Sequence, residues 1–178
     1  MNETQRRLIN IAAIVADAKS RLLGQNTPRG LVTSLESFVY GADFFTVPQE
    51  GMPNAGILTA PVAVGATAQY TTNIASDSDF LLLYLTCFST TGAIVGVFNP
   101  YTYVQFTDNT TNKSLFSEPV LLPLVTGSGS EPYIMQEAMM LYARSQFVTT
   151  LQNLSLTPNY YQFGFSGLKV FYEGGPGL

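Results

Sequence analysis

The first two dozen residues place apolar and polar side chains with the period of a helix. Apolar positions recur at three- and four-residue spacing, at Leu8, Ile11, Ala12, Val15, Ala18 and Leu22. Asn2 and Gln5 stand where an N-cap and its capping-box partner belong, and Gly24 provides a stop. The pattern predicts an amphipathic helix that ends near Gly24.

Residues 25–30 follow this helix with the composition of a linker. Asn26, Thr27, Pro28 and Gly30 favour an irregular connection over a tight helix-to-strand turn. Two interpretations of the helix stay open. Its apolar stripe packs on the protein's own core, as in most amphipathic helices, or the segment 1–30 is an arm that docks on a neighbouring molecule. The linker favours the arm.

From residue 31 onward the pattern changes to the two-residue alternation of β-strands. Glycine, proline and asparagine separate short apolar segments. The expected strands span residues 31–40, 44–47, 69–74, 80–89, 101–107, 120–122, 146–151 and 161–172. Residues 133–142 fit either a helical stripe or a strand, and both assignments stay open.

Two strands carry more specific information. In 80–89, strict alternation places Leu81, Leu83, Leu85 and Cys87 on one face and other large side chains on the opposite face, so this strand is expected in the middle of a sheet. In 161–172, Gly167 shifts the alternation, which indicates a bulge or a bend. The sequence therefore predicts a mainly β protein, an antiparallel, jelly-roll-like β-sandwich over 31–178, preceded by the helical arm and linker at 1–30.

The chain has few reactive side chains, and their absence excludes several kinds of covalent, metal-binding and catalytic site. One cysteine and no histidine rule out a disulfide framework, a thiolate or imidazole metal cage, and a Ser-His or Cys-His nucleophile pair. Cys87 is expected in the core. Asp77 and Asp79 are two apart and offer oxygens for Ca²⁺, but further ligands are missing from the pattern, and acids at a strand entrance commonly solvate a turn. No catalytic residue, metal site or cofactor is predicted.

The charge content predicts assembly. Only 11% of the residues are charged and 46% are hydrophobic, against about 25% charged in a typical soluble domain. Residues 1–30 carry five basic and two acidic side chains, a net charge of +3, whereas 31–178 carry three and ten, a net charge of −7. A basic arm is thus expected to meet an acidic surface of a neighbouring copy. The basic segment has no interleaved aromatics, so nucleic-acid binding is not expected.

Targeting segments are weakly indicated at most. Residues 1–18 share some features of a signal peptide, but Glu3 and Asn10 interrupt them. The longest apolar run, 80–88, is about half of the ~20 residues that a membrane-spanning helix requires. No membrane span is expected.

Four segments within about residues 80–172 form a pattern: 119–123, 127–134, the run 145–155 that ends in Asn153-Leu154-Ser155, and 163–170. In order and character these segments resemble small virion proteins of tailed bacteriophages. The resemblance implies a jelly-roll-like sandwich that decorates or cements an icosahedral head. The first thirty residues are not part of it.

Together these features predict a non-enzymatic virion structural protein, assembled in the host cytoplasm, that forms a dimer or trimer and binds a major capsid protein. The expected attachment residues are the apolar anchors Leu8, Ile11, Val15 and Leu22 and the basic residues Arg6, Arg7 and Arg21. Two alternatives remain: a single-jelly-roll main capsid subunit, and a carbohydrate- or receptor-binding module in which exposed tyrosines and an ion at Asp77 and Asp79 would bind the ligand.

Overall fold

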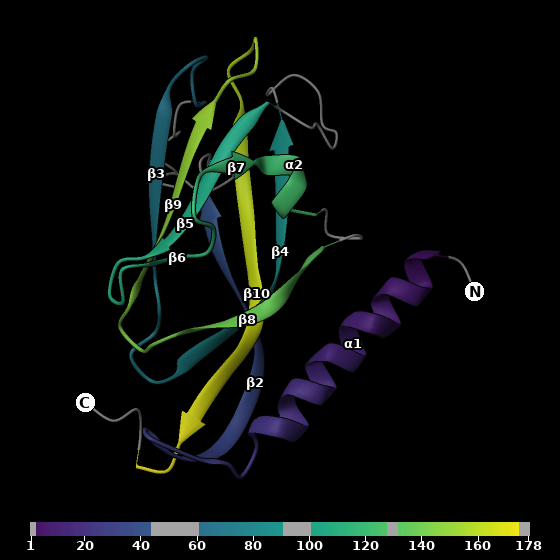
Figure 1. Ribbon diagram of the computed structural model, residues 1–178, viewed down its shortest axis with the longest axis vertical. Helices are drawn as coiled ribbons and strands as arrows, with labels where there is room; N and C mark the ends of the chain where they lie inside the picture. Colours follow the sequence, from purple (N-terminus) through teal and green to yellow (C-terminus); the bar gives the residue numbers. More distant parts are fainter. Residues whose placement is uncertain (1–2, 44–60, 91–100, 128–131, 175–178) are drawn as a thin grey trace, which may run out of the picture.

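The computed structural model describes residues 3–43, 61–90, 101–127 and 132–174, with the side chains of the first helix described from Ile11 onward (Figure 1). Its helices are α1 (Glu3–Leu22) and the single turn α2 (Leu122–Val125). Its strands are β1 (Asn26–Thr27), β2 (Gly30–Asp43), β3 (Thr67–Asn73), β4 (Asp79–Thr90), β5 (Thr102–Asp108), β6 (Lys113–Ser114), β7 (Val120–Leu121), β8 (Tyr133–Leu141), β9 (Gln146–Asn153) and β10 (Tyr160–Tyr172). The expected cap Asn2 and the expected strand 44–47 lie outside the described residues.

The strands form an antiparallel β-sandwich, as the alternating pattern predicts. One sheet has the order β1-β2-β10-β4-β8, and the other has the order β3-β9-β5-β6, with β7 also paired to β5 (Figure 1). Every pair of named strands is antiparallel. β4 lies between β10 and β8, which confirms its expected place inside a sheet. The ambiguous segment 133–142 is the edge strand β8.

The main core joins the two sheets through a cluster of phenylalanine rings. The ring of Phe106 (β5) stacks on Phe147 (β9) at 6.0 Å and meets Phe163 and Phe165 (β10) edge-on at 5.7 and 5.6 Å between centroids. All four side chains are buried. Edge-to-face rings gain energy beyond their buried area, so this cluster fixes the sheets relative to each other. Cys87 packs against the same core, as expected.

A bulge in β4 changes which side chains face this core. β10 pairs Ser166 with Tyr84 and Gly167 with Leu82, so Leu83 is an extra residue. Leu82 and Leu85 therefore both belong to the main core, while Leu81 packs in a second cluster around Val32, Val170 and Tyr172. The expectation that Leu81, Leu83, Leu85 and Cys87 share one face is wrong, because strict alternation ends at the extra residue.

The expected irregularity at Gly167 is the partner side of this bulge. A Cβ atom built on Gly167 would overlap the backbone carbonyl of Leu81 on β4. The strands approach so closely here that only hydrogen fits in the place of a side chain. Gly167 is thus required by packing and not by an unusual φ angle.

We expect Gly167→Ala to lower the free energy of unfolding by about 2–3 kcal/mol or more, because the clash is with backbone that cannot rotate away. The matched control is Gly41→Ala in the neighbouring strand β2, where the added Cβ would lie 3.8 Å from the Phe163 carbonyl oxygen, an ordinary contact. Urea unfolding of both variants measures the difference. Equal stability of the two variants would contradict the close approach.

Candidate functional site

α1 presents one partly buried stripe and one exposed face. From Ile11 onward the half-buried positions are Ile11, Ile14, Val15, Ala18, Lys19 and Leu22, and the other positions are exposed. Three expected anchors, Ile11, Val15 and Leu22, thus lie on the same face of the helix. Arg6, Arg7 and Leu8 lie within α1, but their side chains are outside the described part of the chain. No helix in the described ranges is long and apolar enough to cross a lipid bilayer.

Arg21 has a partner within the helix. Its Nε lies 3.0 Å from the carboxylate of Asp17, one turn earlier, and both side chains are exposed. An exposed i,i+4 pair of this kind contributes only a few tenths of a kcal/mol, about 0.3–0.5. Arg21 therefore stays available to exchange this partner for another acid.

The stripe of α1 does not join the cores of the sandwich. Among the described residues, none of the α1 side chains belongs to the main core or to the second cluster. Figure 1 shows why: the helix joins the sandwich next to the beginning of β2 and extends beside it. Apolar side chains on such a helix have unburied surface to offer to another surface.

The segment expected to be a linker is instead a tight hairpin. Asn26 pairs with Leu31 and Thr27 with Gly30. The amide of Gly24 donates to the carbonyl of Val32 at 3.0 Å, and the amide of Val32 donates to the carbonyl of Gln25 at 2.9 Å. α1 ends at Leu22, and Gly24, two residues later, has a φ of 77°, the left-handed value that suits glycine after a helix. Residues 25–30 thus connect α1 to β2 through a hydrogen-bonded hairpin and not through the expected irregular linker.

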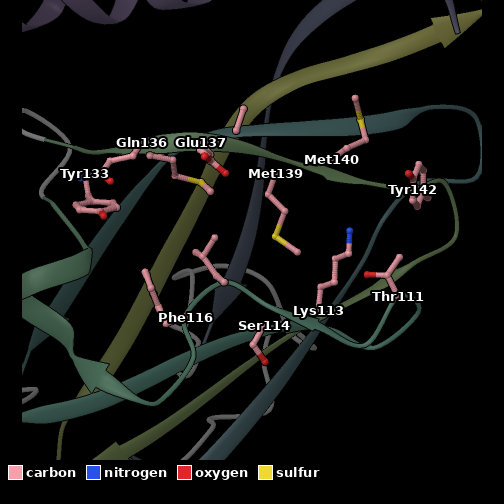
Figure 2. Close-up of a pocket in the computed structure, with 13 residues that line it drawn as sticks. Thr111, Lys113, Ser114, Phe116, Tyr133, Gln136, Glu137, Met139, Met140 and Tyr142 are labelled. Carbon is pink, nitrogen blue, oxygen red and sulfur yellow. The ribbon is translucent and has the colours of Figure 1, made fainter.

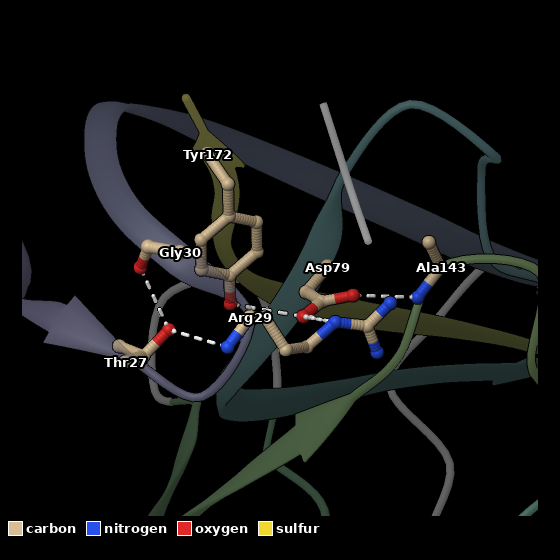
Figure 3. A network of polar contacts seen from close by, with 6 residues as sticks. All are labelled: Thr27, Arg29, Gly30, Asp79, Ala143 and Tyr172. Atoms are coloured by element: carbon tan, nitrogen blue, oxygen red, sulfur yellow. Dashed lines mark hydrogen bonds and ion pairs between the residues drawn. The ribbon is translucent and has the colours of Figure 1, made fainter. Parts of the chain in front are cut away.

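A buried carboxylate holds this hairpin on the sandwich (Figure 3). Asp79, with no exposed side-chain surface, lies 3.4 Å from Nε of Arg29 and accepts hydrogen bonds from the Tyr172 hydroxyl at 2.9 Å and the Ala143 amide at 2.7 Å. The guanidinium of Arg29 also lies 4.9 Å from the centre of the Tyr142 ring. We call these residues the Asp79 clasp. It joins the hairpin, the start of β4, the end of β10 and the β8–β9 turn.

The turn itself is closed by Thr27, whose hydroxyl accepts from the Arg29 amide at 3.2 Å and donates to the Gly30 carbonyl at 2.9 Å. These bonds set the backbone from which the Arg29 side chain reaches Asp79. No sequence pattern marked Arg29 as special. The positive charge of Arg29 complements the negative charge of Asp79, but the two residues are fifty positions apart in the sequence. Only the fold brings them together.

Asp77 and Asp79 engage different partners and do not converge on one ion site. The Asp77 carboxylate is exposed, lies 3.7 Å from Nζ of Lys169 and accepts from the Ser78 hydroxyl. Asp79 is directed inward, into the clasp. No group of three or more potential metal-ligating residues occurs within the described ranges.

A cleft opens at one edge of the sandwich, between β8 and the segment 111–116 (Figure 2). Its volume is about 690 Å³. Its half-buried apolar lining packs against the main core and consists of Leu115, Phe116, Tyr133, Met135 and Met139. Lys113 on one wall and Glu137 on the other are exposed. The margin of the core is therefore accessible from this edge.

The geometry of β8 explains the opening. β8 pairs Ile134 with Tyr84 and Met139 with Leu82 of β4, so the four residues 135–138 lie opposite the single bulged residue Leu83. The middle of β8 thus departs from regular pairing. No sequence pattern predicted the cleft; the alternation in 133–142 fits either a helical stripe or a strand, and the pairing with β4 decides for the strand.

No family model matches the sequence, and the curated proteins include none that is similar to it.

We expect Asp79→Asn to lower the free energy of unfolding by about 2–4 kcal/mol, because the amide keeps hydrogen-bonding capacity but leaves the Arg29 charge without its buried partner. The matched control, Asp17→Asn, removes the exposed ion pair of α1 and should cost less than about 0.5 kcal/mol. Denaturant unfolding distinguishes the two. A loss at Asp79 no larger than at Asp17 would show that the clasp is not a stabilising contact.

Stability should also fall in alkali. Burial raises the pKa of Tyr172, with the hydrogen bond to Asp79 acting in the same direction, and burial also raises the pKa of Tyr161. The unfolded chain releases these protons near pH 10 while the folded protein keeps them, so the free energy of unfolding should drop above about pH 10, by up to about 1.4 kcal/mol per pH unit for each group. Urea unfolding between pH 9 and 11 measures the slope. Tyr172→Phe should remove the contribution of Tyr172 to this slope. An unchanged slope in this variant would show that Tyr172 does not cause the pH dependence.

Proposed function

We propose that this protein is a non-enzymatic virion structural protein that self-associates through its N-terminal arm and decorates or cements an icosahedral phage capsid. Its partners would be other copies of itself and a major capsid protein, in particles assembled in the host cytoplasm. The observation that carries the proposal is the placement of α1, an amphipathic helix whose stripe lies outside both cores of its own chain.

The attachment of α1 supports a docking role. The hairpin bonds and the Asp79 clasp hold its root, so the helix is presented in a defined direction. A presented helix loses less conformational entropy on binding than a flexible arm would, and more of its apolar burial then appears as affinity. A helix needed only for folding would be expected to pack on the sandwich.

The composition supports assembly with many copies. A surface with few charged groups exposes uncharged area that association removes from water. On a capsid each contact can be modest, because copies bound to one lattice are linked and their affinities combine through effective concentration. The opposite net charges of residues 1–30 and of the remainder favour contacts between an arm and another copy.

The β-sandwich is compatible with this role and with many others, since fold alone does not assign function. The resemblance of 80–172 to small virion proteins of tailed bacteriophages favours the virion among them. A sandwich with a helical arm suits work that is mechanical: the folded body adds mass and stiffness at the seams of a shell, while the arm supplies the attachment.

Deleting residues 1–24 should convert the assembled protein into a monomer with a folded sandwich, because the clasp residues and both cores remain. A finer variant, Ile11→Gln with Val15→Gln and Leu22→Gln, removes the stripe and keeps the helix. Its matched control, Ala13→Gln with Ala16→Gln and Ser20→Gln, places three glutamines on the exposed face. Mass photometry reports the oligomer and near-ultraviolet circular dichroism reports the fold.

We expect the stripe variant to dissociate and the control to remain assembled. Assembly that survives both the deletion and the stripe variant would refute attachment by the arm. A full-length chain that stays a single monomer at high concentration would refute self-association itself. Closed particles formed by the purified chain alone, seen by electron microscopy, would identify a main shell subunit in place of a decoration protein.

A further inference from the structure

We infer that the cleft between β8 and the segment 111–116 receives helix α1 of a second copy of this chain. The inference rests on the proposed self-association through the arm and names the surface that the arm binds. Each copy would then offer one helix and one cleft, so the contact is heterologous and joins copies into a closed ring or a continuous array.

The first argument is apolar complementarity. The floor of the cleft is the accessible margin of the main core, where Phe116, Met135 and Met139 are only half-buried. The stripe of α1 supplies aliphatic side chains spaced at Ile11, Val15, Ala18 and Leu22. Methionine side chains are flexible and adapt to such a helix, as they do in other grooves that bind amphipathic helices.

The second argument is length. α1 has 20 residues and β8 has nine. At 1.5 Å per helical residue and about 3.3 Å per strand residue, both elements are about 30 Å long. The helix can therefore lie along the whole wall that β8 provides.

The third argument is charge. Asp17 and Lys19 adjoin Ala18, and with 3.6 residues per turn they project to opposite sides of the stripe. The cleft carries a matching pair, since Glu137 is exposed on the β8 wall and Lys113 on the facing wall (Figure 2). One of the two directions in which the helix can lie brings Lys19 to Glu137 and Asp17 to Lys113. Charge thus selects the direction of α1 in the cleft.

The root of α1 explains why the occupant comes from another copy. Tyr142 lines the cleft and is also the ring beneath Arg29, so the root of the arm is anchored at one end of its own cleft. In Figure 1, α1 is drawn on the side of β8 away from β6, and none of its described residues lines the cleft. To enter its own cleft, the helix would have to turn at its root, where the bonds between Gly24, Gln25 and Val32 hold it. A second copy's helix needs no such change.

The direct test is cross-linking between two differently tagged preparations of the full-length protein. One carries Val15→Cys in the stripe and the other carries Met135→Cys in the cleft. After mixing and mild oxidation, we expect a disulfide that joins the two tags. The matched control replaces Val15→Cys with Ser20→Cys on the exposed face of α1, and it should give at least about fivefold less product, because this face points away from the cleft. The unmodified chain, whose one cysteine, Cys87, is partly buried against the main core, measures the background.

A charge exchange tests the same contact without cysteines. Lys19→Glu and Glu137→Lys should each weaken self-association about three- to tenfold, and the double variant should restore it. Sedimentation velocity measures the dissociation constant, with circular dichroism to confirm the fold. Absence of mutual rescue would overturn the assignment of Glu137.

The outcomes separate this inference from the proposed function. If removal of the stripe abolishes assembly but no disulfide joins helix and cleft, the arm binds another surface and only the inference fails. If a chain carrying both cysteines closes a disulfide within one copy at every dilution, the occupant is the chain's own helix, and the inference again fails. If removal of the stripe leaves assembly intact, the proposed function fails as well.

Discussion

The burial of one carboxylate, that of Asp79, determines how the root of α1 is attached to the sandwich. A buried charge is costly unless it is paired and hydrogen-bonded, and Asp79 meets this condition through Arg29, Tyr172 and the Ala143 amide. Because Arg29 lies only seven residues beyond the end of α1, the requirement of Asp79 for a partner also fixes the root of the helix. The direction of the arm is thus a consequence of satisfying a charge inside the sandwich.

A second constraint acts inside the same sheet, where β10 pairs with β4. The close approach of Gly167 to β4 accommodates the extra residue Leu83, and the strand beyond it, β8, loses regular pairing over 135–138. An edge strand that departs from its sheet leaves part of the core accessible, which a solitary molecule would be expected to avoid. The bulge, the cleft and the half-buried stripe of α1 are the features on which the proposed self-association rests.

Several local features could be predicted from the sequence. The spacing of Ile11, Val15, Ala18 and Leu22 predicts α1, and the alternation in 69–74, 146–151 and 161–172 predicts strands that the structure contains. The large apolar side chains on both faces of 80–89 predict a strand inside a sheet. These predictions succeed because the spacing of apolar residues shows which face of a helix or strand will be buried, whatever element packs against it. Gly167 succeeds for a related reason, since a missing side chain within an alternating strand indicates close backbone contact.

The sequence by itself determined the antiparallel sandwich, the amphipathic helix before it and the scarcity of groups for acid-base chemistry, since composition and period are properties of single segments. Only the tertiary structure decided that residues 25–30 are a hairpin and not a linker, that Leu81 and Leu85 lie in different clusters, and that 111–116 faces β8 across a cleft. Each of these depends on contacts between residues far apart in the chain. The sequence around Arg29 does not predict its pairing with Asp79, and the sequence around Leu83 does not predict that this residue is the extra one in β4. Both features are stabilised by residues that are distant in the sequence and become neighbours only on folding.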